Sequence, residues 1–445
     1  MLTDCLGNPV TLEGEGSLGA LNDFVEGFIA SEARAVNVLQ AAGEDASPMV
    51  QACAAAVHMF AESGAAPGNA RPFIDRALAL QGRCTERERR FIRAVQAWVD
   101  GDIPRAIGLH EEQSREYPRD LVSLKLGQYH QFNRGDAPGM LRLALASLPA
   151  AADVPYLHGM AAFAWEQCHM LEPAEAAARK AIEMRRKEPW AHHALAHVML
   201  TQGRIAEGHA FLQDVSTTWT GLNSFMVTHN WWHQALFALE LDRAREVLDL
   251  YDQRVWGVTK EYTQDQINAV SLLARLELAG VDVGDRWQDL GNYLADRLQD
   301  HVLPFLDMQY LYGLARAGRS EADLLMANIE RHAAHATDDA KAAWQRVCVP
   351  ASRGLLAHAR SDYARAVDEL GQALPRLAEI GGSHAQRDLF AQVRLDALVR
   401  TGQLVEAQQL LQQQLRSQGE SVRLKRQAAR VYMALGLESV ATSLS

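Results

Sequence analysis

Two short strings of the sequence carry paired histidines at a spacing that suits metal binding. In "WAHHALAHVML" His193 and His197 are four residues apart, and in "HNWWH" His229 and His233 repeat that spacing. Residues four apart lie on one face of an α-helix, so each pair can turn two imidazoles toward one ion. Imidazole nitrogens bind zinc, iron or manganese at metal–nitrogen distances of about 2.0–2.2 Å. The sequence therefore predicts a divalent-metal site held by these four side chains.

Polar residues just upstream could complete that site. The string "YLHGMAAFAWEQCHML" contains His158 and Glu166, and we expect one of them to fill the metal shell or to act as a general base. Glu166 and His169 also match, weakly, the E-x-x-H spacing of di-iron helical bundles. The competing interpretation is that the histidines are hydrogen-bonded core residues that stiffen the fold. His192 and His209 are expected at the surface.

A second candidate region is "AEIGGSHAQRDLF", residues 378–390. Ser383 and Gln386 form the S-x-x-Q pattern of a capping box, which predicts the start of a helix. A helix start attracts anions, so Ser383, His384 and Arg387 could meet an anionic part of a substrate, with Asp388 orienting one of them. The competing interpretation is a helix start without further function.

A few polar or aromatic residues lie within otherwise apolar helical segments. Trp232 could contribute to an aromatic wall for a ligand, although core packing is the simpler interpretation. Gln309 and Asp307 in "PFLDMQYLYG", and Arg275 with Glu277 in "SLLARLEL", could face a groove or form structural salt bridges. We assign Trp232 and Gln309, together with Ser383 and Arg387, to substrate binding. The residues assigned to catalysis are His158, Glu166, His384 and Asp388.

The elements that must position these residues are helical hairpins. The repeat "RRFIRAVQAWVDGDIPRAIGLHEEQSREYPRD" has the length of a tetratricopeptide repeat, in which a small residue follows the turn and lets two helices cross closely. The same offset of five between a turn residue and the crossing residue recurs along the chain, at Gly101/Ala106, Gly135/Met140, Glu172/Ala177, Gly203/Gly208, Ser361/Ala366 and Gly402/Ala407. We therefore predict an all-α fold, an α-α superhelix of degenerate tetratricopeptide-like hairpins.

The expected organisation is one continuous superhelix over residues 1–445. We expect an N-terminal cap over 1–60, regular repeats with the histidine cluster over 61–254, irregular repeats over 255–350, and C-terminal repeats with a cap over 351–445.

Composition narrows the functional classes. The net charge is −11 and no basic patch stands out, which disfavours nucleic-acid binding. Apolar runs are too short for a membrane span, and the N-terminus lacks the pattern of a signal peptide. Five widely spaced cysteines without a C-x-x-C pair fit a reduced, cytoplasmic environment.

Several strings of the chain resemble the tetratricopeptide repeat protein 38 family. They run from "TERERRFIRAVQAWVDGD" through "WAHHALAHVMLTQGR" and "HNWWHQALFALE" to "GGSHAQRD", roughly residues 85–400. The resemblance implies a degenerate helical-repeat superhelix but no defined reaction. It also implies polar positions at the histidines above, and two departures from the family pattern, at Gln309 and Asn268, could alter the metal or the chemistry.

The predicted function is the processing of a small molecule at a polar, histidine-rich groove with a divalent metal. A metal-bound water attacking an acyl or amide group is the simplest reaction, and oxygen activation at iron is the second. The alternative is an adaptor that binds a peptide or protein partner without catalysis. Assembly into a homo-oligomer is compatible with either function.

Overall fold

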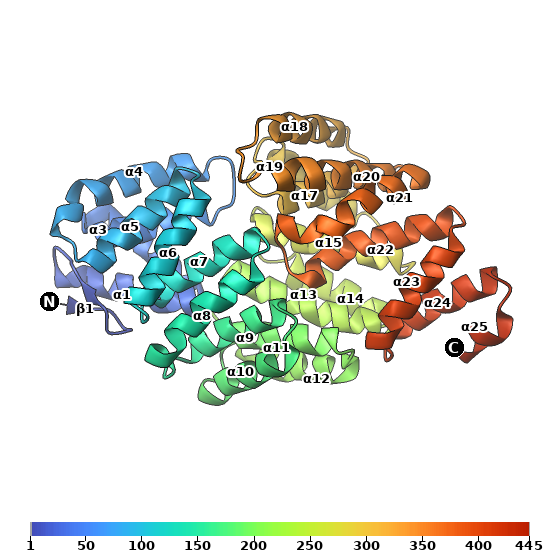
Figure 1. The fold of residues 1–445 in the computed structure, drawn as a ribbon, viewed down its shortest axis with the longest axis horizontal. Helices are drawn as coiled ribbons and strands as arrows, with labels where there is room; N and C mark the ends of the chain where they lie inside the picture. Colours follow the sequence, from blue (N-terminus) through green and yellow to red (C-terminus); the bar gives the residue numbers. More distant parts are fainter. Residues whose placement is uncertain (1, 445) are drawn as a thin grey trace. The chain divides into compact units, whose positions relative to one another are not determined.

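The computed structural model describes residues 2–444, and most of them lie in helices (Figure 1). The only paired strands in that part of the chain are the short β1 (Leu2–Thr3) and β2 (Pro9–Val10). The abundance of alanine and leucine explains this, because both favour helices strongly. The predicted all-α class of paired helices is confirmed.

The chain divides into two compact units. The first extends to Leu195 and also includes Thr217–Met226, and the second consists of Ala196–Ser216 and the chain from Val227 onward. The division falls inside two helices, α11 and α13, and each of these helices is continuous across it.

The first unit is a succession of paired helices. Its elements are α1 (Leu18–Ala30), α2 (Val38–Glu44), α3 (Pro48–Met59), α4 (Ala66–Leu80), α5 (Glu86–Val99), α6 (Ile103–Glu116), α7 (Leu121–Asn133), α8 (Ala137–Ala151), α9 (Pro155–Gln167), α10 (Leu171–Met184) and the first part of α11 (Pro189–Thr201). Neighbours in sequence pack against each other, as α9 does against α10.

The second unit continues the same pattern. Its elements are α12 (Ile205–Val215), most of α13 (Ser224–Glu240), α14 (Ala244–Leu250), α15 (Thr263–Leu278), α16 (Arg286–Leu294), α17 (Pro304–Arg316), α18 (Glu321–His335), α19 (Lys341–Ala343), α20 (Val349–Ala359), α21 (Tyr363–Ala373), α22 (His384–Arg400), α23 (Leu404–Ser417), α24 (Val422–Ala434) and α25 (Glu438–Ser443). Within it α15 packs against α17, α17 against α20, α20 against α22, and α22 also against α15.

Local sequence explains how two of the hairpins turn. Gly101 and Gly135 have positive φ angles of 80° and 72°, a conformation that glycine adopts without a steric cost. The next residue in both cases is an aspartate, Asp102 or Asp136, whose side chain accepts a hydrogen bond from the first turn of the following helix. A turn residue followed by an N-cap residue thus ends one helix and starts its partner.

The repeat register differs from the prediction at one turn. The residue with positive φ between Gly135 and Gly203 is His169, at 57°, and not Glu172. Gly101, Gly135, His169 and Gly203 then follow one another at intervals of 34 residues, so the period is more regular than the sequence suggested. The crossing residue is Ala174 rather than Ala177, and it is fully buried.

The small residues after the turns let paired helices approach closely. Ala106, Ala174 and Ala366 each lie five residues after their turn residue, and none of them is exposed. Gly208 on α12 is the closest case, because a Cβ placed there would meet the ring of Phe237 on α13. This contact fixes the position of the helix that carries His229 and His233.

Length and apolar character decide whether a helix can span a membrane. None of the helices within residues 2–444 combines the length and the apolar character that a membrane span requires.

Candidate metal centre

Histidines from three segments of the second unit lie side by side. His197 comes from α11, His233 from α13, and His384 is the first residue of α22. The ring centroids of His197 and His233 are 4.5 Å apart, and those of His197 and His384 are 5.3 Å apart. The ring centroids of His229 and His233 are 5.0 Å apart. The structure thus brings together strings that are far apart in the sequence.

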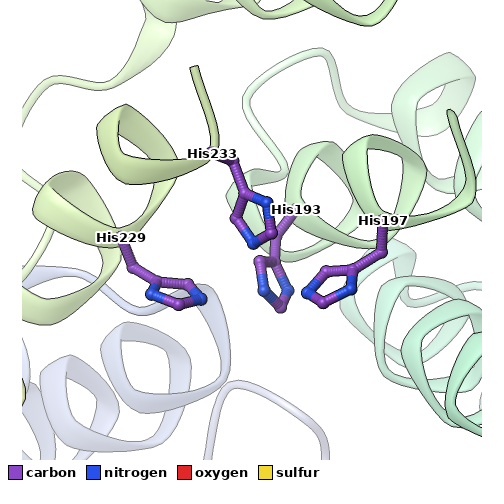
Figure 2. A group of neighbouring side chains, drawn as sticks. All are labelled: His193, His197, His229 and His233. Carbon is purple, nitrogen blue, oxygen red and sulfur yellow. The ribbon is translucent and has the colours of Figure 1, made fainter. Parts of the chain in front are cut away.

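Four of the predicted ligands can offer nitrogens to one ion. His193, His197, His229 and His233 each provide one ring nitrogen, and these nitrogens all lie within 4.8 Å of one another (Figure 2). His193 lies one turn before His197 on the continuous helix α11. All four side chains are buried, with at most 2% of the residue exposed, so they belong to the interior rather than to an open groove.

His229 is oriented by an amide side chain. Its Nδ1 lies 2.9 Å from Oδ1 of Asn268 on α15, an oxygen that can only accept, so Nδ1 carries the proton. Asn268 Nδ2 donates in turn to the hydroxyl of Thr228, which donates to Asp265 at 2.7 Å. Burial lowers the pKa of His229 to about 4, so the ring is neutral and its Nε2 holds a lone pair.

Trp232 lies in the core beside these rings. It is fully buried and stacks on His229, with centroids 5.1 Å apart and an interplanar angle of 11°. The guanidinium of Arg275 lies 5.4 Å from the Trp232 ring centroid and donates to the carbonyl of Ala385 at 2.7 Å. Burial lowers the pKa of Arg275 to about 10. These contacts favour the packing interpretation of Trp232.

The start of α22 delivers His384. Ser383 accepts a hydrogen bond from the backbone of Gln386, and the Gln386 side chain accepts one from the backbone of Ser383, so the predicted capping box is present. His384 Nε2 lies 3.0 Å from the hydroxyl of Thr201, near the end of α11. The capping box therefore fixes the start of α22, where His384 lies beside His197.

Two of the other residues assigned to substrate binding or orientation have local partners, whereas the third, Gln309, has none at its amide oxygen among the described residues. Arg387 donates to the carbonyls of Gly381 and Gly382 in the preceding loop. Asp388 accepts from Gln392 at 2.5 Å. Gln309 is buried on α17, and within residues 2–444 its Oε1 has no hydrogen-bond partner. Asp388 is not among the described residues that could share a metal ion with the histidines of this site.

The upstream candidates lie in the first unit. His158 is half-buried, and its Nε2 is 2.9 Å from the carbonyl oxygen of Ala152. Glu166 is buried on α9 and accepts from Gln167 at 2.7 Å. The helix ends at Gln167, and His169 lies in the following turn. Glu166 and His169 therefore do not share a helix, and the weak E-x-x-H match is not a helical ligand pair.

The expectation that His192 and His209 lie at the surface is wrong. Both are buried, with 0% and 4% of the residue exposed. His192 Nδ1 accepts from the indole of Trp219 at 3.1 Å, and His209 Nε2 lies 2.7 Å from Glu246 Oε1. These partners lie many residues away in sequence, so the local pattern could not reveal them.

The paired helices and their 34-residue turn spacing define the class of protein, a tetratricopeptide-like helical-repeat protein. No family profile matches the chain.

Solved helical-repeat structures are similar to this chain at low identity. A human IFIT1 dimer with PPP-AAAA has 11% identity and a TM-score of 0.43, over 98% of this chain and 94% of that one. Naa15/Naa10 bound to HypK-THB has 12% identity and a TM-score of 0.26, over 96% and 67%. The P58(IPK) TPR domain has 10% identity and a TM-score of 0.23, over 81% and 91%. At these values the likenesses say nothing about function.

Proposed function

We propose that this helical-repeat protein holds one divalent transition metal at the histidines of α11 and α13. The observation that carries the proposal is the convergence of four ring nitrogens within 4.8 Å of one another. Two nitrogens bound tetrahedrally to one ion, each at about 2.1 Å, lie about 3.4 Å apart, so the rings would rotate toward one another on binding.

The surroundings of the site support this assignment. A metal binds neutral imidazole, and burial keeps His229 in that form. The hydrogen bond from Nδ1 of His229 to Asn268 fixes the ring and leaves Nε2 for the metal, which is the usual arrangement around metal-bound histidine. A purely imidazole set suits zinc, iron or nickel better than magnesium or calcium.

The proposed chemistry is hydrolysis of a small molecule. If His197, His229 and His233 are the ligands, a fourth position remains for water, and a zinc ion would bring the pKa of that water to about 7. His384, at 5.3 Å from the ring of His197, is the side chain placed to exchange a proton there. Oxygen activation at iron is the second reaction that such a ligand set supports.

We also propose kinship with the tetratricopeptide repeat protein 38 family, in a cytoplasmic setting. The two most specific strings of that resemblance, "HNWWH" and "GGSHAQRD", supply His229, His233 and His384. Residues that the family pattern marks as polar are thus adjacent in the folded chain.

A second candidate function is a scaffold that binds a peptide or protein partner, with or without a structural metal. The observation that favours it is the burial of all four histidines, because a catalytic metal needs access for its substrate. In this case the histidine group would stiffen the repeats rather than react.

Zinc titration tests the proposal. The full chain, purified without a nickel column and stripped of metal, should bind one equivalent of zinc. His233→Ala and His197→Ala should each weaken binding at least 100-fold while the far-UV circular dichroism stays helical. His335→Ala, at an exposed position on α18, is the matched control and should bind as the wild type does. Equal zinc affinity in all four proteins would refute the ligand assignment.

A further inference from the structure

A separate cleft lies in the second unit, at the carboxyl ends of α15, α17, α20 and α22. Its volume is about 340 Å³, within the range of small-molecule sites. Glu277, Tyr312, His358 and Asp396 contribute from the last turns of those helices, and Tyr363 from the start of α21. None of the four proposed metal ligands is among the described residues that line it.

A chain of hydrogen bonds crosses the wall of this cleft. Burial raises the pKa of Tyr312, so its hydroxyl keeps its proton, and it forms a hydrogen bond with Nδ1 of His358 at 3.1 Å. Nε2 of His358 donates to Asp396 Oδ2 at 3.0 Å, and that same oxygen accepts from Arg400 Nε at 2.8 Å. Asp396 is thereby held between two donors, and it fixes one edge of the Arg400 guanidinium.

Two arginines line this space and have N–H donors that their ion pairs do not use. Arg316 Nη2 pairs with Glu277 at 2.8 Å, whereas its Nε is buried and has no acceptor among residues 2–444. The guanidinium of Arg400 lies 5.1 Å from the ring centroid of Tyr363, and about half of its side chain is exposed. Each guanidinium has five N–H donors, so one ion pair per arginine leaves several of them for a ligand.

The positive charges of Arg316 and Arg400 affect which ligands this cleft can bind. The hydrogen bond with Asp396 raises the pKa of Arg400, but the positive charge of Arg316 acts in the opposite direction, so the two guanidinium groups repel each other. An anion between them would relieve this repulsion. A cation would add to it. Of the three carboxylates that line the cleft, Glu277 and Asp396 pair with its arginines, and Asp282 accepts a hydrogen bond from the backbone of Gly284.

We infer that this cleft binds a small organic anion, whose carboxylate or phosphate group lies between Arg316 and Arg400. Planar guanidinium groups bind both kinds of oxyanion in a bidentate manner, which is why arginine prevails at such sites. The Tyr363 ring offers an apolar face beside Arg400 for the rest of the ligand. The site is independent of the proposed metal centre.

Calorimetric titration of the full chain with malonate and with inorganic phosphate, each at constant ionic strength, tests this inference. At least one anion should saturate one site, and the tighter of the two identifies the oxyanion class. Arg400→Gln should weaken binding at least tenfold. The control is Arg353→Gln, an arginine of α20 that pairs with Glu330 outside the cleft, and it should leave the affinity unchanged.

Two further variants keep the result interpretable. Arg316→Gln should weaken binding as Arg400→Gln does, with circular dichroism to verify the fold. His233→Ala should bind the anion with wild-type affinity, which separates this cleft from the metal centre. Absence of saturable binding of either anion, equal weakening by Arg353→Gln, or loss of binding in His233→Ala would each overturn the inference.

Discussion

The close crossing of α12 and α13 leads to a prediction about the stability of the helices that hold the metal centre. A Cβ at Gly208 would overlap the edge of the Phe237 ring, at Cε1 and Cζ. Phe237 lies one turn after His233 on α13 and is fully buried. Gly208→Ala therefore forces the ring or the helix to move.

The magnitude follows from two opposing effects. Overpacking a buried contact costs about 1–3 kcal/mol, whereas alanine in place of glycine inside a helix contributes about 1 kcal/mol of stability. Gly108 on α6 has no heavy atom within 4 Å of the position where a Cβ would lie. Gly108→Ala should therefore gain only the stability that comes from the higher helix propensity of alanine. The difference in unfolding free energy between the two variants should be about 1–3 kcal/mol.

Urea unfolding followed by circular dichroism measures this difference. Phe237→Leu and the double variant complete a mutant cycle, in which the cost of Gly208→Ala should shrink by at least about 1 kcal/mol when the ring is absent. If Gly208→Ala is as stable as Gly108→Ala, or its cost is the same with leucine at 237, the reasoning about the crossing is refuted.

Three further perturbations have defined outcomes. Burial lowers the pKa of His110 to about 3, so its imidazole stays neutral in the folded protein. In the unfolded chain the imidazole takes up a proton below about pH 6.5, so the free energy of unfolding falls as the pH drops. This histidine alone should lower the free energy of unfolding by about 2 kcal/mol between pH 7.5 and pH 5. His110→Gln should flatten the pH dependence of the unfolding free energy by that amount, and an unchanged slope would contradict the assignment. Ser383→Ala should lower stability by about 1 kcal/mol in chemical denaturation because the cap of α22 is lost, whereas Ser320→Ala, at a helix start without a side-chain cap, should have little effect; equal losses would argue against the cap. Asn268→Ala should weaken zinc binding about 10–100-fold in a competition assay, since His229 loses its orienting partner, and wild-type affinity would exclude that role.

Local patterns predicted the helices and the two histidine pairs. Spacing alone places His193 with His197 and His229 with His233, because residues four apart share a helix face. The capping box at Ser383 was equally readable, since both of its partners lie within three residues.

Features that depend on distant partners could not be predicted in this way. The sequence favoured Glu172 as a turn residue, but a side chain other than glycine, His169, takes the left-handed conformation there. His192 and His209 looked like surface residues because their partners, Trp219 and Glu246, lie in other segments.

The partner of His229 is a partial exception. The resemblance singled out position 268 as a departure from the family pattern, and Asn268 proves to be the residue that orients His229. The contact between Asn268 and His229 could not be inferred from the sequence. The reason is that α13 and α15 are joined by a long connection whose path the sequence does not define.

The most direct test of the account is the metal content of the protein itself. Elemental analysis of the untagged chain, purified without a nickel column, should find close to one equivalent of zinc, iron or another divalent transition metal. A chelator should then lower the melting temperature. Absence of stoichiometric metal, with a melting temperature that the chelator leaves unchanged, would contradict the proposed centre.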